Sequence, residues 1–176
     1  MDLKLKRTPG IYLAGFMGSG KTTVGQALAD RLGWDFVDID AEVEAAAQMT
    51  ITQIFDTMGE PEFRRLETEM LRHLTKKVER GAPVVVALGG GAFVQPGNFE
   101  ILQPKGVSIW IDCPFAALEL RIAADTANRP LARNSEELHK LFEARLPGYL
   151  KADHRVEGDR EVADVVESIM QLPIWK

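Results

Sequence analysis

The segment AGFMGSGKTTVG, residues 14–25, has the residue types and spacing of a loop that binds phosphate. It satisfies the pattern G-x-x-x-x-G-K-[ST] with Gly15, Gly20, Lys21 and Thr22, and it lies between an apolar run and a helical pattern. Glycines let successive backbone N–H groups face an anion, the lysine reaches the β- and γ-phosphates, and the threonine hydroxyl binds Mg²⁺. The segment predicts a nucleoside triphosphate site, but motors, switches, sensors and small-molecule kinases all use such a loop.

Two aspartates close the next apolar run, in the sequence FVDID at residues 36–40. On a strand, side chains two residues apart point the same way, so Asp38 and Asp40 would both face the crevice at the carboxyl edge of a sheet. Two like charges there favour a cation, which the Mg²⁺ of a nucleotide would supply. The sequence is equally compatible with a structural role, in which Asp40 caps a helix that begins at Ala41.

An arginine and a run of glycines are further candidates for binding an acceptor. In EFRRLE, residues 62–67, Arg64 and Glu67 are three residues apart and share a helix face beside an apolar stripe, although an ordinary surface ion pair would have the same spacing. Residues 89–91 are three glycines directly after an apolar run. They indicate that a ligand approaches the main chain there, and a tight turn is a compatible explanation.

Short, continuous apolar runs that alternate with amphipathic stretches must position these residues. The strand candidates are residues 10–15, 35–38, 83–88, 106–111 and 153–157. Helical patterns run through Val24, Leu28 and Leu32, over residues 61–79, after Pro114, and from 162 to 170. The long pattern at 61–79 has an apolar stripe of Phe63, Leu66, Met70, Leu74 and Val78. The alternation predicts an α/β fold with a parallel sheet and helices on both faces, and the polar segment 124–137 is expected to be a loop.

The composition is that of one globular domain of 176 residues, with 45% hydrophobic and 27% charged residues. A net charge of -5 argues against a nucleic-acid or anionic-membrane surface. With neither a signal-peptide pattern nor an apolar run of 18 residues, the expected location is the cytoplasm. Cys113 is the only cysteine, which excludes an intramolecular disulfide, and the three histidines are scattered, so no structural metal is expected.

Taken together, the motifs resemble those of the shikimate kinases in order and spacing, from about Ile11 to Met170. The motifs are GFMGSGKTTVG, the DID pair, QIFDTMGEPEFRRLE, the GGG run, NRPL and RLPGY. The resemblance implies a three-layer P-loop kinase fold of the nucleoside-monophosphate-kinase type, with a five-stranded parallel sheet ordered 2-3-1-4-5. It also implies a single domain that contains a substrate-binding helical region at about 41–71 and a mobile lid at about 124–136.

The implied reaction transfers the γ-phosphoryl group of ATP to the 3-hydroxyl of shikimate, giving 3-phosphoshikimate and ADP, on the way to chorismate and the aromatic amino acids. By resemblance, ATP is bound by Gly18, Ser19, Gly20, Lys21, Thr22, Thr23, Arg121 and Arg129. Shikimate is bound by Asp40, Arg64, Gly89, Gly90, Gly91 and Arg145. The resemblance assigns Mg²⁺ to Thr22 and Asp38, and catalysis to Lys21, Asp40 and Arg129. Asp40 would act either as a base or by orienting the hydroxyl.

Two other functions would share part of these motifs. A P-loop kinase for another small hydroxy acid, such as gluconate, would keep the phosphate loop without requiring Asp40, Arg64, the glycine run and Arg145 together. A regulatory module would bind the same ligands without turnover, but only about ten residues precede the first apolar run, too few for a helix-turn-helix. The expected partners are therefore ATP and shikimate alone, and the expected state is a monomer. One departure from the family is Gly148 in RLPGY, where a bulkier residue is common.

Overall fold

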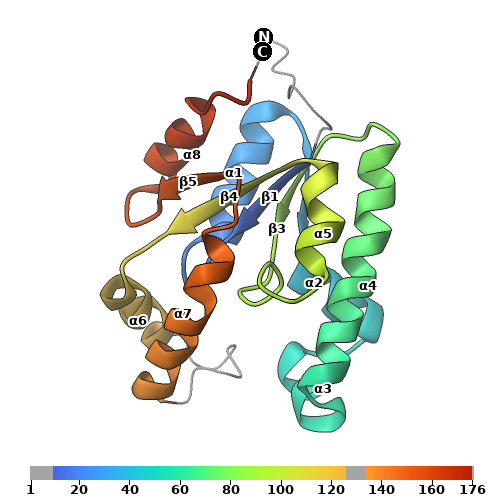
Figure 1. The fold of residues 1–176 in the computed structure, drawn as a ribbon, viewed down its shortest axis with the longest axis vertical. Coiled ribbons are helices and arrows are strands. Elements are labelled where there is room, and N and C mark those ends of the chain that lie inside the picture. Colours follow the sequence, from blue (N-terminus) through green and yellow to red (C-terminus); the bar gives the residue numbers. More distant parts are fainter. Residues whose placement is uncertain (1–9, 126–133, 176) are drawn as a thin grey trace.

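The computed structural model describes residues 10–125 and 134–175 (Figure 1). Within these ranges, five parallel strands form one sheet in the order β2-β3-β1-β4-β5. The strands are β1 Gly10–Ala14, β2 Asp35–Asp38, β3 Val84–Ala87, β4 Val107–Asp112 and β5 His154–Glu157. The α/β fold class and the strand order 2-3-1-4-5 are both confirmed.

The central strands are the most deeply buried. Every residue of β1 and β3 is buried, and so are the first five residues of β4, because helices cover both faces of the sheet there. The edge strands β2 and β5 keep exposed or half-buried positions instead. The sequence predicts a continuous buried run for all five strands, but only the three central strands, β1, β3 and β4, have one.

The helices cover the sheet on both sides. They are α1 Lys21–Leu32, α2 Ile39–Ala47, α3 Ile51–Met58, α4 Glu60–Glu79, α5 Asn98–Leu102, α6 Phe115–Ala124, α7 Ser135–Tyr149 and α8 Val162–Met170. Right-handed crossovers place α4, α5 and α7 on one face, and α1 on the opposite face, where α8 packs against it (Figure 1). Within the described ranges, no helix is both long and apolar enough to cross a bilayer.

Helix α4 departs from the apolar stripe that its sequence predicts. Phe63, Leu74 and Val78 are buried as expected, whereas Leu66 and Met70 are only partly buried. Other positions of α4 are buried as well, and one of them is the carboxylate residue Glu67. The helix therefore turns a charged residue toward the interior of the protein, which calls for a compensating charge nearby.

The strand register brings the functional segments to one edge of the sheet. Ala87, the last residue of β3, pairs with Leu13 of β1 on one side and with Asp38 of β2 on the other. The glycine-rich loop after β1, the aspartate that ends β2 and the glycine run after β3 therefore leave the sheet side by side. This carboxyl edge is where ligands bind in open α/β sheets.

Candidate active site

The loop between β1 and α1 has the backbone of a phosphate-binding loop. Gly18 and Gly20 adopt φ values of 82° and 93°, a conformation that favours glycine, and helix α1 begins directly after Gly20. The side chain of Lys21 is buried, and its Nζ donates to the carbonyl oxygens of Gly15 and Phe16 at 2.7 and 3.0 Å. The ammonium group thus lies where backbone N–H groups and a helix N-terminus would meet an anion.

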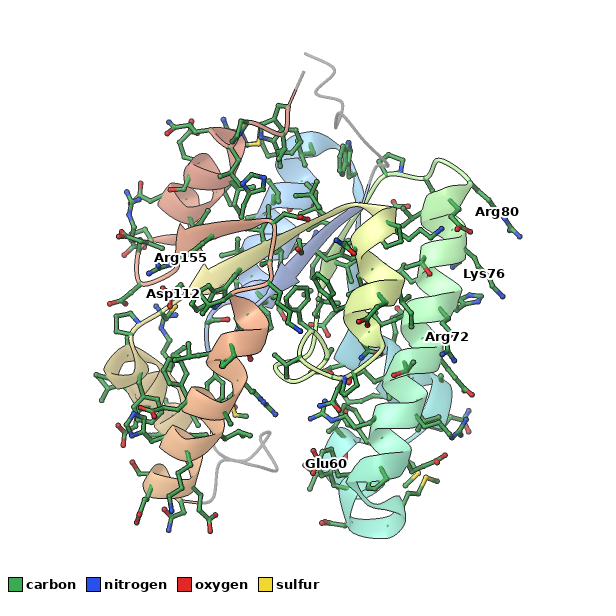
Figure 2. All side chains as sticks on the ribbon, in the orientation of Figure 1. Glu60, Arg72, Lys76, Arg80, Asp112 and Arg155 are labelled. Atoms are coloured by element: carbon green, nitrogen blue, oxygen red, sulfur yellow. The ribbon has the colours of Figure 1, made fainter. Side chains whose placement is uncertain are left out.

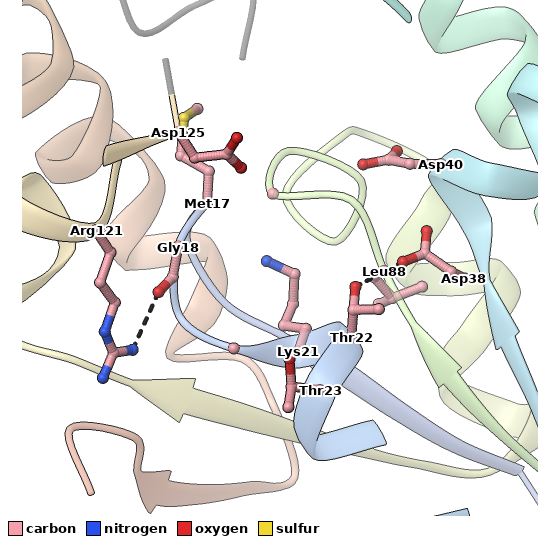
Figure 3. Close-up of a pocket in the computed structure, with 12 residues that line it drawn as sticks. Met17, Gly18, Lys21, Thr22, Thr23, Asp38, Asp40, Leu88, Arg121 and Asp125 are labelled. Atoms are coloured by element: carbon pink, nitrogen blue, oxygen red, sulfur yellow. Dashed lines mark hydrogen bonds between the residues drawn. The ribbon is translucent and has the colours of Figure 1, made fainter. Parts of the chain in front are cut away.

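A cavity of about 360 Å³ opens above this loop (Figure 3). The residues that line it come from the phosphate loop and the start of α1, the end of β2 and the start of α2, the segment after β3, and α6 with its C-cap. They are Met17, Gly18, Gly20, Lys21, Thr22, Thr23, Asp38, Asp40, Leu88, Gly90, Arg121 and Asp125. The cavity therefore joins most of the residues expected to bind ATP to two of those expected at the acceptor, Asp40 and Gly90. Arg64, Gly89, Gly91 and Arg145 are not among the residues that line it. Ser19, a residue of the loop itself, is 1% exposed and does not line the cavity.

The two aspartates of the DID motif reach the cavity in a different way from the one expected. Strand β2 ends at Asp38, which is the N-cap of α2, and its Oδ1 accepts a hydrogen bond from Ala41 N at 3.1 Å. Asp40 lies in the first turn of that helix, so the expectation that it shares a strand face with Asp38 is wrong. The alternative in which Asp40 is the cap is wrong too, because the chain turns helical one residue after the strand ends.

Asp38 also contacts the phosphate loop directly. The Thr22 hydroxyl donates to Asp38 Oδ2 at 2.6 Å, as Figure 3 shows. Because the Thr22 hydroxyl directs its hydrogen toward the carboxylate, its oxygen lone pairs can face the cavity. A hydroxyl and a carboxylate held together are oxygen ligands of the kind that Mg²⁺ prefers.

Asp40 is half-buried at the boundary between the cavity and the glycine run. Its Oδ1 is buried and has no hydrogen-bond partner within the protein. Burial, together with the charge of Asp38, raises its pKa to about 6, although the charges of Lys21 and Arg64 act in the opposite direction. An unpartnered buried carboxylate oxygen with a raised pKa is the mark of a ligand-binding or proton-accepting group.

Arg64 is held by a carboxylate that the sequence did not identify as a site residue. Its Nη1 donates to Glu67 Oε1 and Oε2 at 3.0 and 3.3 Å, and Glu67 is 1% exposed. Burial raises the pKa of Glu67 to about 7, against the effect of the Arg64 charge. The available signal was the spacing of three residues on a partly apolar helix face, which could not distinguish a buried pair from a surface one.

The three glycines after β3 make room for the side chains of the site. A Cβ on Gly89 would lie 2.7 Å from Asp40 Oδ1 and 3.0 Å from Glu67 Oε2. A Cβ on Gly91 would lie 2.6 Å from Arg64 Nη2 and 2.9 Å from Arg145 Nη2. None of the three has a positive φ, so they are needed for close approach rather than for an unusual backbone.

The glycine run also brings two arginines together. Arg64 from α4 and Arg145 from α7 both reach within 3 Å of the same point beside Gly91. Burial, and secondarily the charge of Arg64, lowers the pKa of Arg145. Arg64 Nε and Arg145 Nη1 are buried without hydrogen-bond partners. Two adjacent guanidinium groups with free donors form a site for a carboxylate or a phosphate.

The remaining predicted positions lie around this centre. Arg121 Nη1 donates to the Gly18 carbonyl at 3.1 Å, which places it against the phosphate loop. Arg129 and most of the expected lid lie outside the described residues. Gly148, the departure from the family pattern, is matched by Val94: a Cβ on Gly148 would lie 2.3 Å from Val94 Cγ1. The bulkier residue common in the family would not fit beside this valine.

Comparisons with known proteins identify the type of site. A family model described as "Shikimate kinase" matches residues 17–172. The shikimate kinase of Ruegeria pomeroyi is 40% identical over 91% of this chain and 82% of its own, and that of Cereibacter sphaeroides is 43% identical over 88% and 76%. A shikimate kinase from Acinetobacter baumannii, solved in complex with shikimate, superposes with a TM-score of 0.86 at 38% identity, over 93% of this chain and 91% of its own.

A more distant structure shares the fold alone. A gluconokinase from Sinorhizobium meliloti covers 92% of this chain and 90% of its own with a TM-score of 0.58, at only 19% identity. At this level of identity the likeness extends to the fold and not to the acceptor.

Proposed function

The chain belongs to the shikimate kinase family, and from this membership we propose how its residues divide the work of ATP-dependent shikimate phosphorylation. The activity itself is a step of aromatic amino-acid biosynthesis. In our proposal the 3-hydroxyl of shikimate accepts the γ-phosphoryl group. One observation carries the assignment of residues: the phosphate-loop cavity, which Gly90 lines, and the Arg64–Arg145 pair meet at the Gly89–Gly91 turn.

We assign the carboxylate of shikimate to Arg64 and Arg145. The free donors of the two guanidinium groups support this role, because a buried donor without a partner costs about 1–3 kcal/mol until a ligand satisfies it. Planar guanidinium groups also match a carboxylate through paired hydrogen bonds. The glycine run, with no side chains of its own, leaves room for the ring of the substrate.

We assign the reacting hydroxyl to Asp40, which lies between the arginine pair and the phosphate loop. Its unpartnered Oδ1 is available to accept the hydroxyl hydrogen bond and so to orient the oxygen toward the phosphate. The raised pKa supports a second role as the group that takes up the proton, since a base is most effective when its pKa is near the working pH. Lys21, at the base of the cavity, would compensate the charge of the transferring group.

We assign Mg²⁺ to Thr22 and Asp38. Within the described residues no group of three or more His, Cys, Asp or Glu side chains could hold a metal by itself. One hydroxyl and one carboxylate fit an ion that keeps waters and nucleotide phosphates as its other ligands, as Mg²⁺ commonly does. When bound, the ion neutralises oxygens of the β- and γ-phosphates.

The roles of the other ATP contacts follow the resemblance to the family. Gly18, Ser19, Gly20 and Thr23 would surround the phosphates, Arg121 would contact adenine, and Arg129 would approach the transferring group as part of a lid that excludes water. We further propose that the chain acts as a monomer in the cytoplasm, with ATP, its Mg²⁺ ion and shikimate as its ligands.

An ester of the substrate tests the arginine assignment. Shikimate methyl ester keeps the hydroxyls and removes the negative charge, so the wild-type KM should be at least tenfold higher for the ester than for shikimate. In Arg145→Ala this preference should shrink, because one of the two carboxylate partners is gone. If Arg145→Ala discriminates between acid and ester as well as the wild type does, Arg145 does not bind the carboxylate.

A further inference from the structure

Tyr149 links the glycine run to the arginine pair. It is the last residue of α7, and it lies one helical turn after Arg145 on the same face. Its hydroxyl donates a hydrogen bond to the carbonyl oxygen of Gly90. Arg145 Nη1 lies beside the same glycine, 3.3 Å from the position that a Cβ on Gly90 would take. The guanidinium is also close enough to Tyr149 to lower the pKa of the phenol, against the larger effect of burial. The phenol thus lies beside two parts of the site that come from different segments of the chain.

The sheet fixes the position of that oxygen. Tyr149 is 1% exposed, and its ring stacks on Trp110 of β4 with a centroid distance of 5.9 Å and an interplanar angle of 21°. The other partner of Trp110 is Arg155, whose Cζ lies 5.3 Å from the ring centroid and whose guanidinium pairs with Asp112 at 2.5 Å (Figure 2). A hydroxyl mounted on such packed rings has little freedom to move, which is what a supporting group requires.

An aromatic ring also contacts the Arg145 guanidinium. The Cζ of Arg145 lies 5.5 Å from the ring centroid of Phe16, and Phe16 packs edge-on against Phe142 of α7 at 5.3 Å. The Arg145 guanidinium therefore lies between an aromatic group, the Phe16 ring, and a polar group, the Tyr149 hydroxyl, while its Nη1 has no hydrogen-bond partner. This is the arrangement expected of a side chain held ready for a ligand.

We propose that Tyr149 is a positioning residue for the shikimate carboxylate site, where its hydroxyl, together with the ring of Phe16, holds the Arg145 guanidinium in place beside the Gly90 carbonyl. The inference rests on the proposed role of Arg145. Without the hydroxyl, the Gly90 carbonyl would lose its donor and Arg145 would occupy several rotamers, so that binding the substrate would have to restore their order. Tyr149 itself does not touch the reacting atoms in this account.

The two tyrosines of the chain provide a matched pair of variants. Tyr149→Phe removes only the oxygen that contacts the site. Tyr12→Phe removes the other buried phenol oxygen, which donates to the Lys105 carbonyl at 3.1 Å, near Gly10 at the amino-terminal end of β1. We expect Tyr149→Phe to raise the shikimate KM about 3- to 10-fold, with the ATP KM and kcat within about twofold of the wild type. Tyr12→Phe should leave both KM values unchanged.

A double-mutant cycle identifies the residue through which Tyr149 acts. In an Arg145→Ala background, Tyr149→Phe should change the shikimate KM by less than about twofold, because the group that it positions is already gone. An unchanged shikimate KM in Tyr149→Phe, or an effect that is fully additive with Arg145→Ala, would overturn the inference. If Arg145→Ala alone left the shikimate KM unchanged, the proposed function of the arginine pair would fail first, and this inference with it.

Folding is checked by circular dichroism and thermal unfolding of each variant. Should Tyr149→Phe not fold, Phe16→Leu tests the same positioning from the other side of Arg145. It should also raise the shikimate KM, and that rise should disappear in the Arg145→Ala background. A Phe16→Leu variant with an unchanged shikimate KM would then overturn the inference.

Discussion

Arg64 donates from one nitrogen, Nη1, to both carboxylate oxygens of Glu67, at 3.0 and 3.3 Å, and Glu67 is almost completely buried. The pair lies against the Gly89–Gly91 turn, beside the buried side chain of Arg145. A charge that is removed from water is costly unless it is paired, and Glu67 is the hydrogen-bond partner that holds Arg64 beside Arg145. Burial nevertheless outweighs this pairing at Glu67, because the pKa of its carboxyl lies above the ordinary value.

The first prediction concerns the effect of Glu67 on stability at different pH values. Its pKa is raised from 4.5 to about 7, so between these pH values the folded protein binds more protons than the unfolded chain. The contribution of Glu67 to the free energy of unfolding is fully present below about pH 4.5 and is lost as the pH rises through about 7. The amount lost is at most about 3 kcal/mol. Glu67→Gln cannot titrate, so its free energy of unfolding relative to the wild type should increase from pH 5 to pH 8.

Urea unfolding at four pH values measures this difference. Glu69→Gln is the control, because Glu69 is an exposed residue of the same helix that pairs with Arg65 on the surface. Its pH profile should run parallel to that of the wild type. A Glu67→Gln profile that is also parallel would mean that Glu67 does not carry a raised pKa in the folded protein.

The second prediction concerns Arg64. Arg64→Ala removes charge-assisted hydrogen bonds worth about 1.5–3 kcal/mol to the substrate carboxylate, and should raise the shikimate KM roughly 10- to 150-fold. The ATP KM should change little, because no atom of Arg64 lines the phosphate-loop cavity. Steady-state kinetics with each substrate varied in turn measure both constants, and an unchanged shikimate KM would remove Arg64 from the site.

The third prediction concerns Lys21. Lys21→Met should lower kcat by about 100-fold or more, since it removes a preorganised charge from the phosphate position. The fold should persist, because the hydrogen bonds that Lys21 makes to the Gly15 and Phe16 carbonyls can be replaced by water from the adjoining cavity. Circular dichroism provides the check on folding. Turnover near the wild-type rate would contradict the phosphate assignment.

The fourth prediction concerns Gly89. A methyl group there would lie 2.7 Å from Asp40 Oδ1 and 3.0 Å from Glu67 Oε2, so Gly89→Ala should displace at least one carboxylate and lower kcat/KM for shikimate at least tenfold. Gly81→Asn is the control, because Gly81 has open space around it and asparagine tolerates its φ of 87°. If Gly89→Ala retained wild-type kcat/KM, the close packing at this turn would not matter for catalysis.

Much of this architecture could be predicted from the sequence, because it depends on local patterns. The phosphate loop, the strand order and the convergence of Asp40, Arg64 and Arg145 all followed from motifs and their resemblance to a family. The path of the chain through Asp38 and Asp40 could not, since either residue is a good helix cap and only the end of β2 decides between them.

The burial of charged and polar groups was the other feature that could not be predicted from the sequence. Glu67 and Tyr149 are defined by contacts to segments far away in the chain, at Gly89 and Gly90. A spacing of three residues identifies a pair but not its environment, and a tyrosine in a helix pattern is normally assigned to the core. Long-range packing, which a single sequence does not specify, gives both residues their proposed roles.

The central claim is that this site transfers phosphate to shikimate, and acceptor-dependent ADP release tests it most directly. With ATP and Mg²⁺ present, shikimate should give sustained release of ADP and a product phosphorylated at the 3-hydroxyl, as read by ³¹P NMR, while gluconate should give none. Turnover with gluconate and none with shikimate would assign the chain to a different acceptor. Binding of ATP and shikimate without any product would contradict the account as a whole.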